Sequence, residues 1–327
     1  MLSDQSPAFV IAEVGNNHNG DLALAKRLVD LALEAGADGV KFQMRDLSSL
    51  YSNQGKNAEA GDDLGSQYTL DLLNRFQLRN EQLLEVFDHC RARHPAAVHA
   101  LGSGQPAGAG GRWADLASAD AAYRRHSIDE LRRVVAMAAE LRGCFPKTQR
   151  PVLVLNAGGW TPHGFLPVAE RAALYDRVAE SLAEIDLSPV ELGIQTMPPF
   201  PWHFGGQSHH NLFVDPEEIR TFCERTGHKI CLDISHSMMA CNDYHWDFGQ
   251  FLKTVLPYSV HLHVVDAKGI DGEGVQIGQG DVDFCQLKAA LDQYAPGVQF
   301  IPEVWQGHKN QGEGFWEALA FLEGVGV

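Results

Sequence analysis

The sequence has few basic residues for its length, and several common patterns are missing from it. Its 327 residues include 26 Lys and Arg against 42 Asp and Glu, which gives a formal net charge of −16. Because such a charge repels phosphate backbones, it argues against nucleic-acid binding. No stretch approaches about eighteen uninterrupted apolar residues, and the letters MLSDQSPAF lack the basic start and apolar core of a signal peptide. We therefore expect a cytoplasmic protein without nucleic-acid or membrane partners.

Cysteine is scarce and is not arranged in pairs. The six cysteines are scattered without the spacing of a disulfide framework or a thiolate zinc knuckle. They are Cys90, Cys144, Cys223, Cys231, Cys241 and Cys285. This pattern is typical of a protein from a reducing compartment.

Short apolar runs alternate with longer segments of helical periodicity, which is typical of parallel strands joined by crossover helices. Eight runs are candidates for strands: FVIAEVG at 9–15, GVKFQM at 39–44, AVHAL at 97–101, VLVLNAG at 152–158, ELGIQT at 191–196, KICLDIS at 229–235, SVHLHVV at 259–265 and QFIPEV at 299–304. Eight such strands close a barrel. We therefore predict an α/β fold, a single (β/α)8 TIM barrel over residues 1–327.

Helix signals lie between these runs. Helices are predicted near 22–35, 68–93, 167–185, 283–294 and 314–324. Ser127 with Glu130 forms a capping-box pattern, and Asp215 with Pro216 is typical of an N-cap and a first-turn proline. The glycine-rich segment 102–113 is either a loop or an inter-domain linker. Because a linker there would divide the strands into sets that cannot close alone, we favour one barrel.

Metal-binding residue types lie at the carboxyl ends of the last three strands. Asp233, His263 and Glu303 are carboxylate and imidazole donors, which suit Mn, Mg, Co or Zn. His261 points the same way as His263, but His263 is nearer the active-site end of its strand. A single buried histidine or aspartate is often a hydrogen-bonded core residue. Two buried carboxylates, however, need a cation or a polar network, so the set predicts a divalent metal site.

These residues resemble a known family. The segments LDISH, HLHVVDAKG with the later GQGDVDF, and FIPEVW are similar to the xylose-isomerase-like barrels over roughly 97–327. The family includes sugar isomerases, sugar epimerases and endonuclease IV. The resemblance implies that Asp233, His263 and Glu303 hold the metal, and that His236 binds substrate.

The fifth strand departs from that family, because Gln195 lies where a fourth ligand, a glutamate, is expected. An amide oxygen can still bind a metal weakly, but it cannot accept a proton from carbon. Glu191 is on the same face but about 13 Å away, too far to replace it.

The amino-terminal segment resembles another family. FVIAEVGNNHNGDLALAKRLVDLALEAGADGVKFQM is similar to the start of sialic acid synthases over roughly 9–90. The resemblance implies that phosphoenolpyruvate and an amino sugar would contact five residues, namely Glu13, Asn17, His18, Lys41 and Gln43. The later metal-binding histidines and the carboxy-terminal domain of those synthases are not recognisable. The barrel is therefore predicted to be a hybrid, with two synthase-like units in 1–95 and six isomerase-like units in 96–327.

Within this segment, Glu13 is a candidate for the missing carboxylate and a possible partner of Lys41. The alternative is that these residues only fill the barrel mouth. Three further residues follow strands and are candidates for substrate binding: His163, Lys268 and Lys309. Asp243, His245 and Asp247 also cluster, but no strand end fixes them, so we do not expect them to bind metal.

The resemblance implies isomerisation or epimerisation of a sugar, sugar phosphate or sugar acid through an enediolate. Glu303 is the expected base, with His236 orienting a substrate oxygen. One alternative is a nonulosonate synthase-like enzyme that condenses phosphoenolpyruvate with an amino sugar. Another is a degenerate sugar-binding barrel without activity. DNA cleavage is disfavoured by the acidic charge, and the sequence leaves a homo-oligomer open.

Overall fold

A computed structural model describes most of the chain. The described residues are 11–15, 17–37, 39–44, 78–93, 98–103, 107–108, 112–142, 150–203, 206–307 and 309–327. The statements below refer to these residues.

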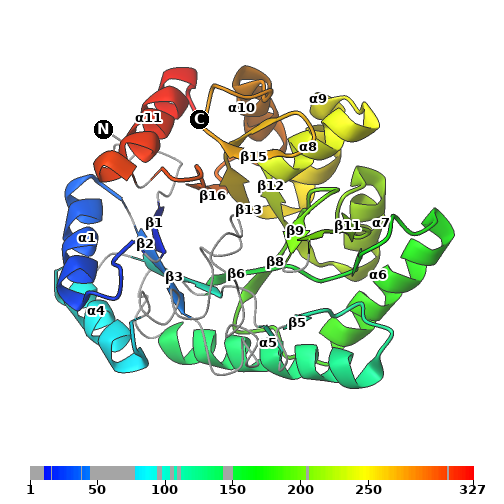
Figure 1. The fold of residues 1–327 in the computed structure, drawn as a ribbon, viewed down its shortest axis with the longest axis horizontal. Coiled ribbons are helices and arrows are strands. Elements are labelled where there is room, and N and C mark those ends of the chain that lie inside the picture. Colours follow the sequence, from blue (N-terminus) through cyan, green and yellow to red (C-terminus); the bar gives the residue numbers. More distant parts are fainter. Residues whose placement is uncertain are drawn as a thin grey trace, which may run out of the picture.

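Eight parallel strands form the centre of the molecule (Figure 1). They are β1 (Ile11–Gly15), β2 (Gly39–Met44), β3 (Val98–Ser103), β6 (Val152–Leu155), β8 (Glu191–Gln195), β12 (Lys229–Asp233), β13 (Ser259–Val264) and β16 (Gln299–Pro302). Hydrogen bonds join them into two arcs, β1-β2-β3 and β6-β8-β12-β13-β16. Contacts between β1 and β16 and between β3 and β6 complete the ring. The predicted (β/α)8 barrel is confirmed.

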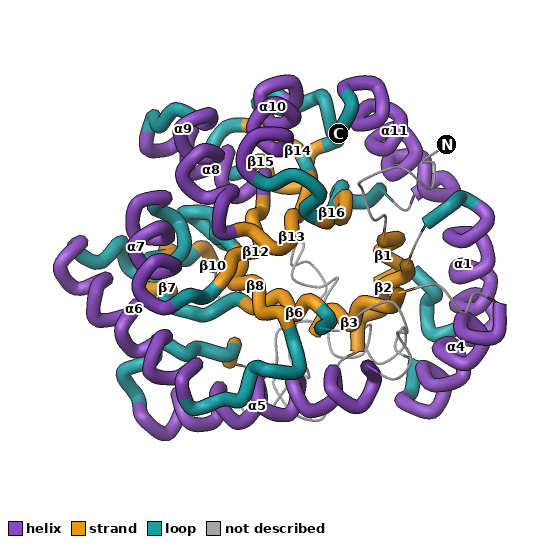
Figure 2. The backbone as a smooth tube through the Cα atoms, turned by 180° about the vertical axis from the view of Figure 1, so that it is seen from behind, coloured by secondary structure: helices purple, strands orange, loops and turns teal. Residues whose placement is uncertain are grey.

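Helices surround this ring, as Figure 2 shows from the opposite side. They are α1 (Leu22–Glu34), α4 (Asn80–Arg93), α5 (Ala121–Leu141), α6 (Val168–Ala183), α7 (Pro216–Thr226), α8 (Ile234–Tyr244), α9 (Phe248–Val255), α10 (Phe284–Tyr294) and α11 (Lys309–Val325), with a 3-10 turn at Leu256–Tyr258. In both views α11 lies beside α1, so the end of the chain returns to its start. None of the described helices is long and apolar enough to span a bilayer.

Short antiparallel strand pairs extend from the loops outside the barrel. They are β4 (Ala107–Gly108) with β5 (Arg112–Trp113), β7 (Trp160–Thr161) with β11 (His209–His210), β9 (Trp202–His203) with β10 (Gly206–Gln207), and β14 (Asp266–Lys268) with β15 (Gly272–Val275). The last pair follows β13 and matters for the site described below.

Two predicted helix starts have different outcomes. Asp215 caps α7 by accepting hydrogen bonds from the backbone of Glu217 and Glu218, as expected. The capping box at Ser127 is wrong, because α5 already begins after Asp120. Asp120 is an equally good cap, and no helix breaker separates it from Ser127. The Ser127 hydroxyl instead donates to the Tyr123 carbonyl within the helix.

Most of the apolar core lies between the second arc and its helices. Strand residues such as Leu232 and Leu262 are fully buried, as expected for parallel strands covered on both faces. A smaller cluster joins β1 and β2 to α1 and α4 through Val14, Val29 and Phe42. Cys90, Cys223, Cys231, Cys241 and Cys285 are free thiols, so the described cysteines form no disulfide.

Candidate metal centre

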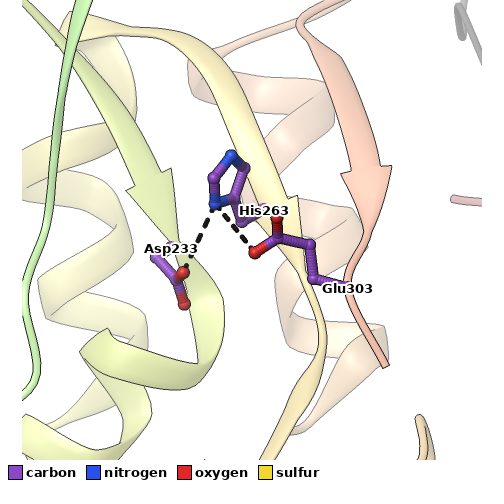
Figure 3. Close-up of side chains that lie close together, drawn as sticks. All are labelled: Asp233, His263 and Glu303. Carbon is purple, nitrogen blue, oxygen red and sulfur yellow. Dashed lines mark ion pairs between the residues drawn. The ribbon is translucent and has the colours of Figure 1, made fainter. Parts of the chain in front are cut away.

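The three strands that carry the expected ligands are neighbours in the sheet. β12 pairs with β13 so that Asp233 lies opposite His263, and β13 pairs with β16. Glu303 directly follows β16 and donates its backbone N–H to the Val264 carbonyl. All three side chains therefore project from the carboxyl ends of adjacent strands and converge (Figure 3). Of the residues described, they form the one group of three or more with the geometry to hold a metal ion.

The donor atoms lie close together in a buried setting. One atom from each of Asp233, His263 and Glu303 lies within 4.8 Å of the other two. The Nδ1 atom of His263 is 3.0 Å from Glu303 Oε2 and 3.5 Å from Asp233 Oδ2. Two carboxylates and an imidazole at one point are a donor set suited to Mn, Mg, Zn or Co. These residues therefore fit the divalent ion that their chemistry implies.

Gln195 completes the cluster from β8. Its Nε2 donates to Asp233 Oδ2 at 3.0 Å and lies 3.2 Å from His263 Nδ1. The amide nitrogen therefore faces the candidate ligands from the neighbouring strand. Glu191 is at the other end of the strand, where it pairs with Arg150 at 2.6 Å.

The charged residues of the cluster shift one another's pKa values. Burial alone would lower the pKa of His263, but the neighbouring Cys231 and Glu303 raise it above the usual range. Burial would likewise raise the pKa of Glu303, but His263, Lys41 and His236 lower it below the usual range. Glu303 is thus a carboxylate at neutral pH, available to bind a cation or accept a proton.

His236 lies beside the cluster at the start of α8. Its Nδ1 is 2.8 Å from the Thr196 carbonyl and 3.3 Å from Asp233 Oδ2. Its backbone N–H donates to Asp233 Oδ1, so Asp233 also caps this helix. Burial would lower the pKa of His236, but the charges of Asp233 and Glu273 raise it to about 9.

The amino-terminal arc brings one residue to the same cluster. The Nζ atom of Lys41, in β2, lies 3.6 Å from Glu303 Oε1. His18 is buried, stacks on Phe42 and accepts from the Gly20 backbone, while Asn17 lies in the turn after β1. Glu13 and Gln43 belong to β1 and β2, but their side chains lie outside the described part of the structure.

Three other predicted substrate-binding residues lie outside the three-residue cluster. His163 is exposed in the loop after β7. Lys268 is exposed and pairs with Asp281 at 2.5 Å, and Lys309 donates to the Gln306 side chain at the start of α11.

The choice between the two histidines of β13 agrees with the geometry. His261 is buried two residues before His263 on the same strand, edge to face with it, and is not in the candidate group of Asp233, His263 and Glu303. Burial lowers the pKa of His261 to about 3, with further contributions from the charges of His263 and Lys41. Asp243, His245 and Asp247 are not part of this candidate group, and Asp247 caps α9.

One residue of the site was missed by sequence analysis. Glu273 in β15 places Oε1 3.1 Å from His236 Nε2. In the sequence it stands between two glycines, DGEGV, which is typical of a turn, and no strand periodicity marks it. Its position in the folded structure, beside His236, identifies it as part of the site.

Comparison with known proteins decides the family. A model described as a xylose isomerase-like TIM barrel matches residues 29–325. The chain belongs to the xylose isomerase-like TIM barrel family. It is similar to the solved structure of L-ribulose 3-epimerase, with a TM-score of 0.61 and 16% identity over 97% of this chain and 95% of that chain. It is also similar to endonuclease IV from Thermus thermophilus, with a TM-score of 0.58 and 15% identity over 97% and 98% of the two chains.

Similarity to the synthases is local. The spore coat polysaccharide biosynthesis protein SpsE of Bacillus subtilis is 38% identical over 94 residues, 28% of this chain and 24% of that protein. N-acetylneuraminate-9-phosphate synthase of Homo sapiens is 48% identical over 53 residues, 16% of this chain and 15% of that protein. The chain thus spans a quarter or less of these curated relatives. For this xylose isomerase-like barrel, a synthase-like segment is supported only by these short matches.

Proposed function

We propose that this xylose isomerase-like barrel is a divalent-metal-dependent isomerase or epimerase of a sugar, sugar phosphate or sugar acid. The observation that carries the proposal is the convergence of Asp233, His263 and Glu303 at the carboxyl ends of adjacent strands. That end of such a barrel is where active sites lie. The similarity to a sugar epimerase structure adds support at the level of the fold.

Asp233, His263 and Glu303 would hold the metal, with Gln195 as a weaker fourth contact. When bound there, the cation would supply Lewis-acid chemistry toward a substrate carbonyl and the adjacent hydroxyl, which would lower the cost of removing the neighbouring C–H proton. Glu303 accepts the proton, since its lowered pKa keeps it ionised. His236 orients a substrate oxygen beside it.

The amide at Gln195 bears on the type of reaction. Inverting a carbon centre by proton exchange requires an acceptor on one face of the carbon and a donor on the other. Moving a proton between neighbouring carbons on one face requires a single base. Asp233, the other carboxylate among the proposed ligands, accepts hydrogen bonds from Gln195 and from the backbone of His236. This leaves Glu303 as the proposed base and Gln195 unable to act as a second one, so isomerisation is favoured over epimerisation.

The metal site is tested directly by metal analysis of purified protein after dialysis against Mn²⁺. We expect about one equivalent in the wild type and in Gln195→Glu, and much less in His263→Gln. The matched control is Asp243→Asn, an acidic residue on α8 outside the group, which should bind as the wild type does. Absence of retained metal in both the wild type and Gln195→Glu would contradict the proposal.

Turnover is tested by proton exchange from deuterated water into a panel of ketoses and their phosphates. Exchange that needs Mn²⁺ but not phosphoenolpyruvate supports the isomerase or epimerase. Phosphate release that needs phosphoenolpyruvate supports a synthase-like reaction, for which the local synthase matches argue. Sugar binding without either reaction identifies a degenerate barrel.

A further inference from the structure

A hairpin after β13 brings a third carboxylate, besides Asp233 and Glu303, to the edge of the site. Glu273 in β15 lies 3.1 Å from His236, and its side chain is 49% exposed whereas that of His236 is 8% exposed. A ligand entering from solvent would therefore reach Glu273 before it reached His236. Glu273 is not one of the three metal-binding candidates.

The hairpin is held in place next to two of those candidates. Gly274 donates its N–H to Ser235 Oγ at 3.3 Å, and its carbonyl accepts from the Trp305 N–H at 2.9 Å. Ser235 and Trp305 each lie two residues after a proposed ligand, Asp233 or Glu303. A Cβ added at Gly274, whose φ is +74°, would lie 2.9 Å from Trp305 Cβ. The residue beside Glu273 is therefore fitted closely between the first turn of α8 and the turn after β16, and Glu273 is placed by that fit.

The base of the hairpin is equally fixed. The Asp266 carboxylate is fully buried. It accepts hydrogen bonds from four backbone N–H groups, those of Ala267, Gly278, Gly280 and Val282. Four such bonds satisfy the charge and anchor the segment after β15 to the start of β14. Glu273 thus projects from a rigid support, as a residue that orients another must.

The contacts of His236 show what Glu273 does. The Thr196 carbonyl at Nδ1 and the Glu273 carboxylate at Nε2 are both acceptors, and they face opposite sides of the ring. Together they fix the rotation of the imidazole. With Glu273 removed, the described contacts hold the ring from the Nδ1 side alone.

We propose that Glu273 is a positioning residue that fixes the His236 imidazole and, with it, presents a hydroxyl-binding pair to the sugar. The substrate part of this proposal rests on the proposed function. Because a carboxylate repels phosphate and carboxylate groups, the part of the substrate that reaches this pair carries neutral hydroxyls. An anionic group, where the substrate has one, would lie toward Lys41 on the other side of Glu303.

Nitrogen-15 NMR of the histidine side chains tests the positioning role, with the His236 signals assigned by their loss in His236→Asn. In Glu273→Ala we expect the Nε2 signal of His236 to shift clearly. Glu273→Gln, which keeps an acceptor oxygen, should restore part of the wild-type position. Asp271→Ala removes an exposed carboxylate from the same hairpin and should leave the signals unchanged. Identical His236 signals in the wild type and Glu273→Ala would overturn the proposal.

Steady-state exchange kinetics with the Mn²⁺-loaded protein test the substrate part, using D-fructose and D-fructose 6-phosphate as probes. A hydrogen bond to a charged group is worth about 1.5–3 kcal/mol, so Glu273→Ala should raise KM about tenfold or more, with a smaller change in kcat. An unchanged KM overturns the hydroxyl-binding role. If the wild type exchanges neither sugar, that result counts against the proposed function, while the His236 signals still decide whether Glu273 positions the ring.

Discussion

Gln195 places a neutral amide beside the two carboxylates of the candidate centre. Its amide donates to Asp233 and touches His263 at the place where the sequence resemblance implies a carboxylate. A neutral donor there offsets the repulsion between Asp233 and Glu303. The site is therefore held together by hydrogen bonds among its own residues, and its stability depends less on a cation than that of a four-ligand site would.

Replacing this amide by a carboxylate should make the fold depend on metal. In Gln195→Glu a third carboxylate joins the cluster and the hydrogen bond to Asp233 is lost. We expect the metal-free variant to lose about 1–3 kcal/mol of unfolding free energy, since like charges are forced together in a buried site. Added Mn²⁺ should restore more stability to the variant than it adds to the wild type.

Urea unfolding in EDTA and in Mn²⁺ measures both quantities. The control is Glu191→Gln, at the far end of the same strand, whose response to metal should match that of the wild type. Equal stabilisation of the wild type and Gln195→Glu by Mn²⁺ would contradict the assignment of residue 195 to the centre.

The sequence was sufficient for the residues that strands place. Asp233 is the last residue of β12, and His263 lies next to the end of β13. His261 points the same way as His263, so nearness to the carboxyl end of the strand distinguishes the two. The sequence was not sufficient for Glu273, whose place depends on backbone contacts of Gly274 with Ser235 and Trp305. Such backbone contacts leave no recognisable pattern of side chains in the sequence. The pairing of Lys41 with Glu303 was missed for a related reason, since it joins strands that are far apart in the chain.

At the scale of elements, the partly buried carboxylate of Asp115 links the segment before α5 to the loop after β6. Asp115 Oδ1 accepts from the backbone N–H groups of Ala117 and Gly159. The Ser127 hydroxyl accepts from the Asp115 N–H. Sequence patterns assigned Ser127 to a helix cap, but the structure uses it to fix this loop.

Ionisation of Asp115 should lower the free energy of unfolding as pH rises. Burial raises its pKa from 3.8 to about 6, despite hydrogen bonds from Ala117 and Gly159 that lower it. Between about pH 4 and pH 6 the unfolded chain releases this proton while the folded protein keeps it, so the unfolding free energy decreases with pH across that window. The decrease amounts to at most about 3 kcal/mol.

Asp115→Asn keeps an oxygen acceptor and cannot ionise, so this decrease should disappear in the variant. Urea unfolding at pH 4, 5, 6 and 7 compares the two proteins. Asp271→Asn, an exposed change, should follow the wild type. Parallel curves for the wild type and Asp115→Asn would show that Asp115 does not titrate in this range.

The β14–β15 hairpin should be sensitive to its anchor. In Asp266→Asn one carboxylate oxygen becomes an NH₂ group that faces two backbone donors. Leaving two buried N–H groups without acceptors should cost about 2–5 kcal/mol of unfolding free energy. Hydrogen exchange should increase at Gly278, Gly280 and Val282. A variant with wild-type exchange at these amides would show that the hairpin is anchored by other contacts.

At the scale of the whole molecule, the barrel consists of two unequal arcs. The larger apolar cluster packs under β6 to β16, and the smaller one joins β1 and β2 to α1 and α4. Neither arc is a closed sheet on its own. The ring is completed where β1 contacts β16 and where β3 contacts β6. Lys41 and Glu303 form an ion pair across this closure. The amino-terminal arc therefore contributes a charge beside the candidate metal centre.

A fragment of residues 96–327 tests whether the two parts are one folding unit. Without β1 and β2, the outer edges of β3 and β16 would expose unpaired backbone groups, which favour aggregation. Glu303 would also lose the charge of Lys41. We expect the fragment to aggregate or to unfold without a cooperative transition, whereas the full chain unfolds cooperatively. Circular dichroism during urea unfolding and light scattering measure these properties. A monomeric fragment with a cooperative transition and wild-type Mn²⁺ binding would instead mean that the six isomerase-like units form a domain of their own, to which the first two units are an addition.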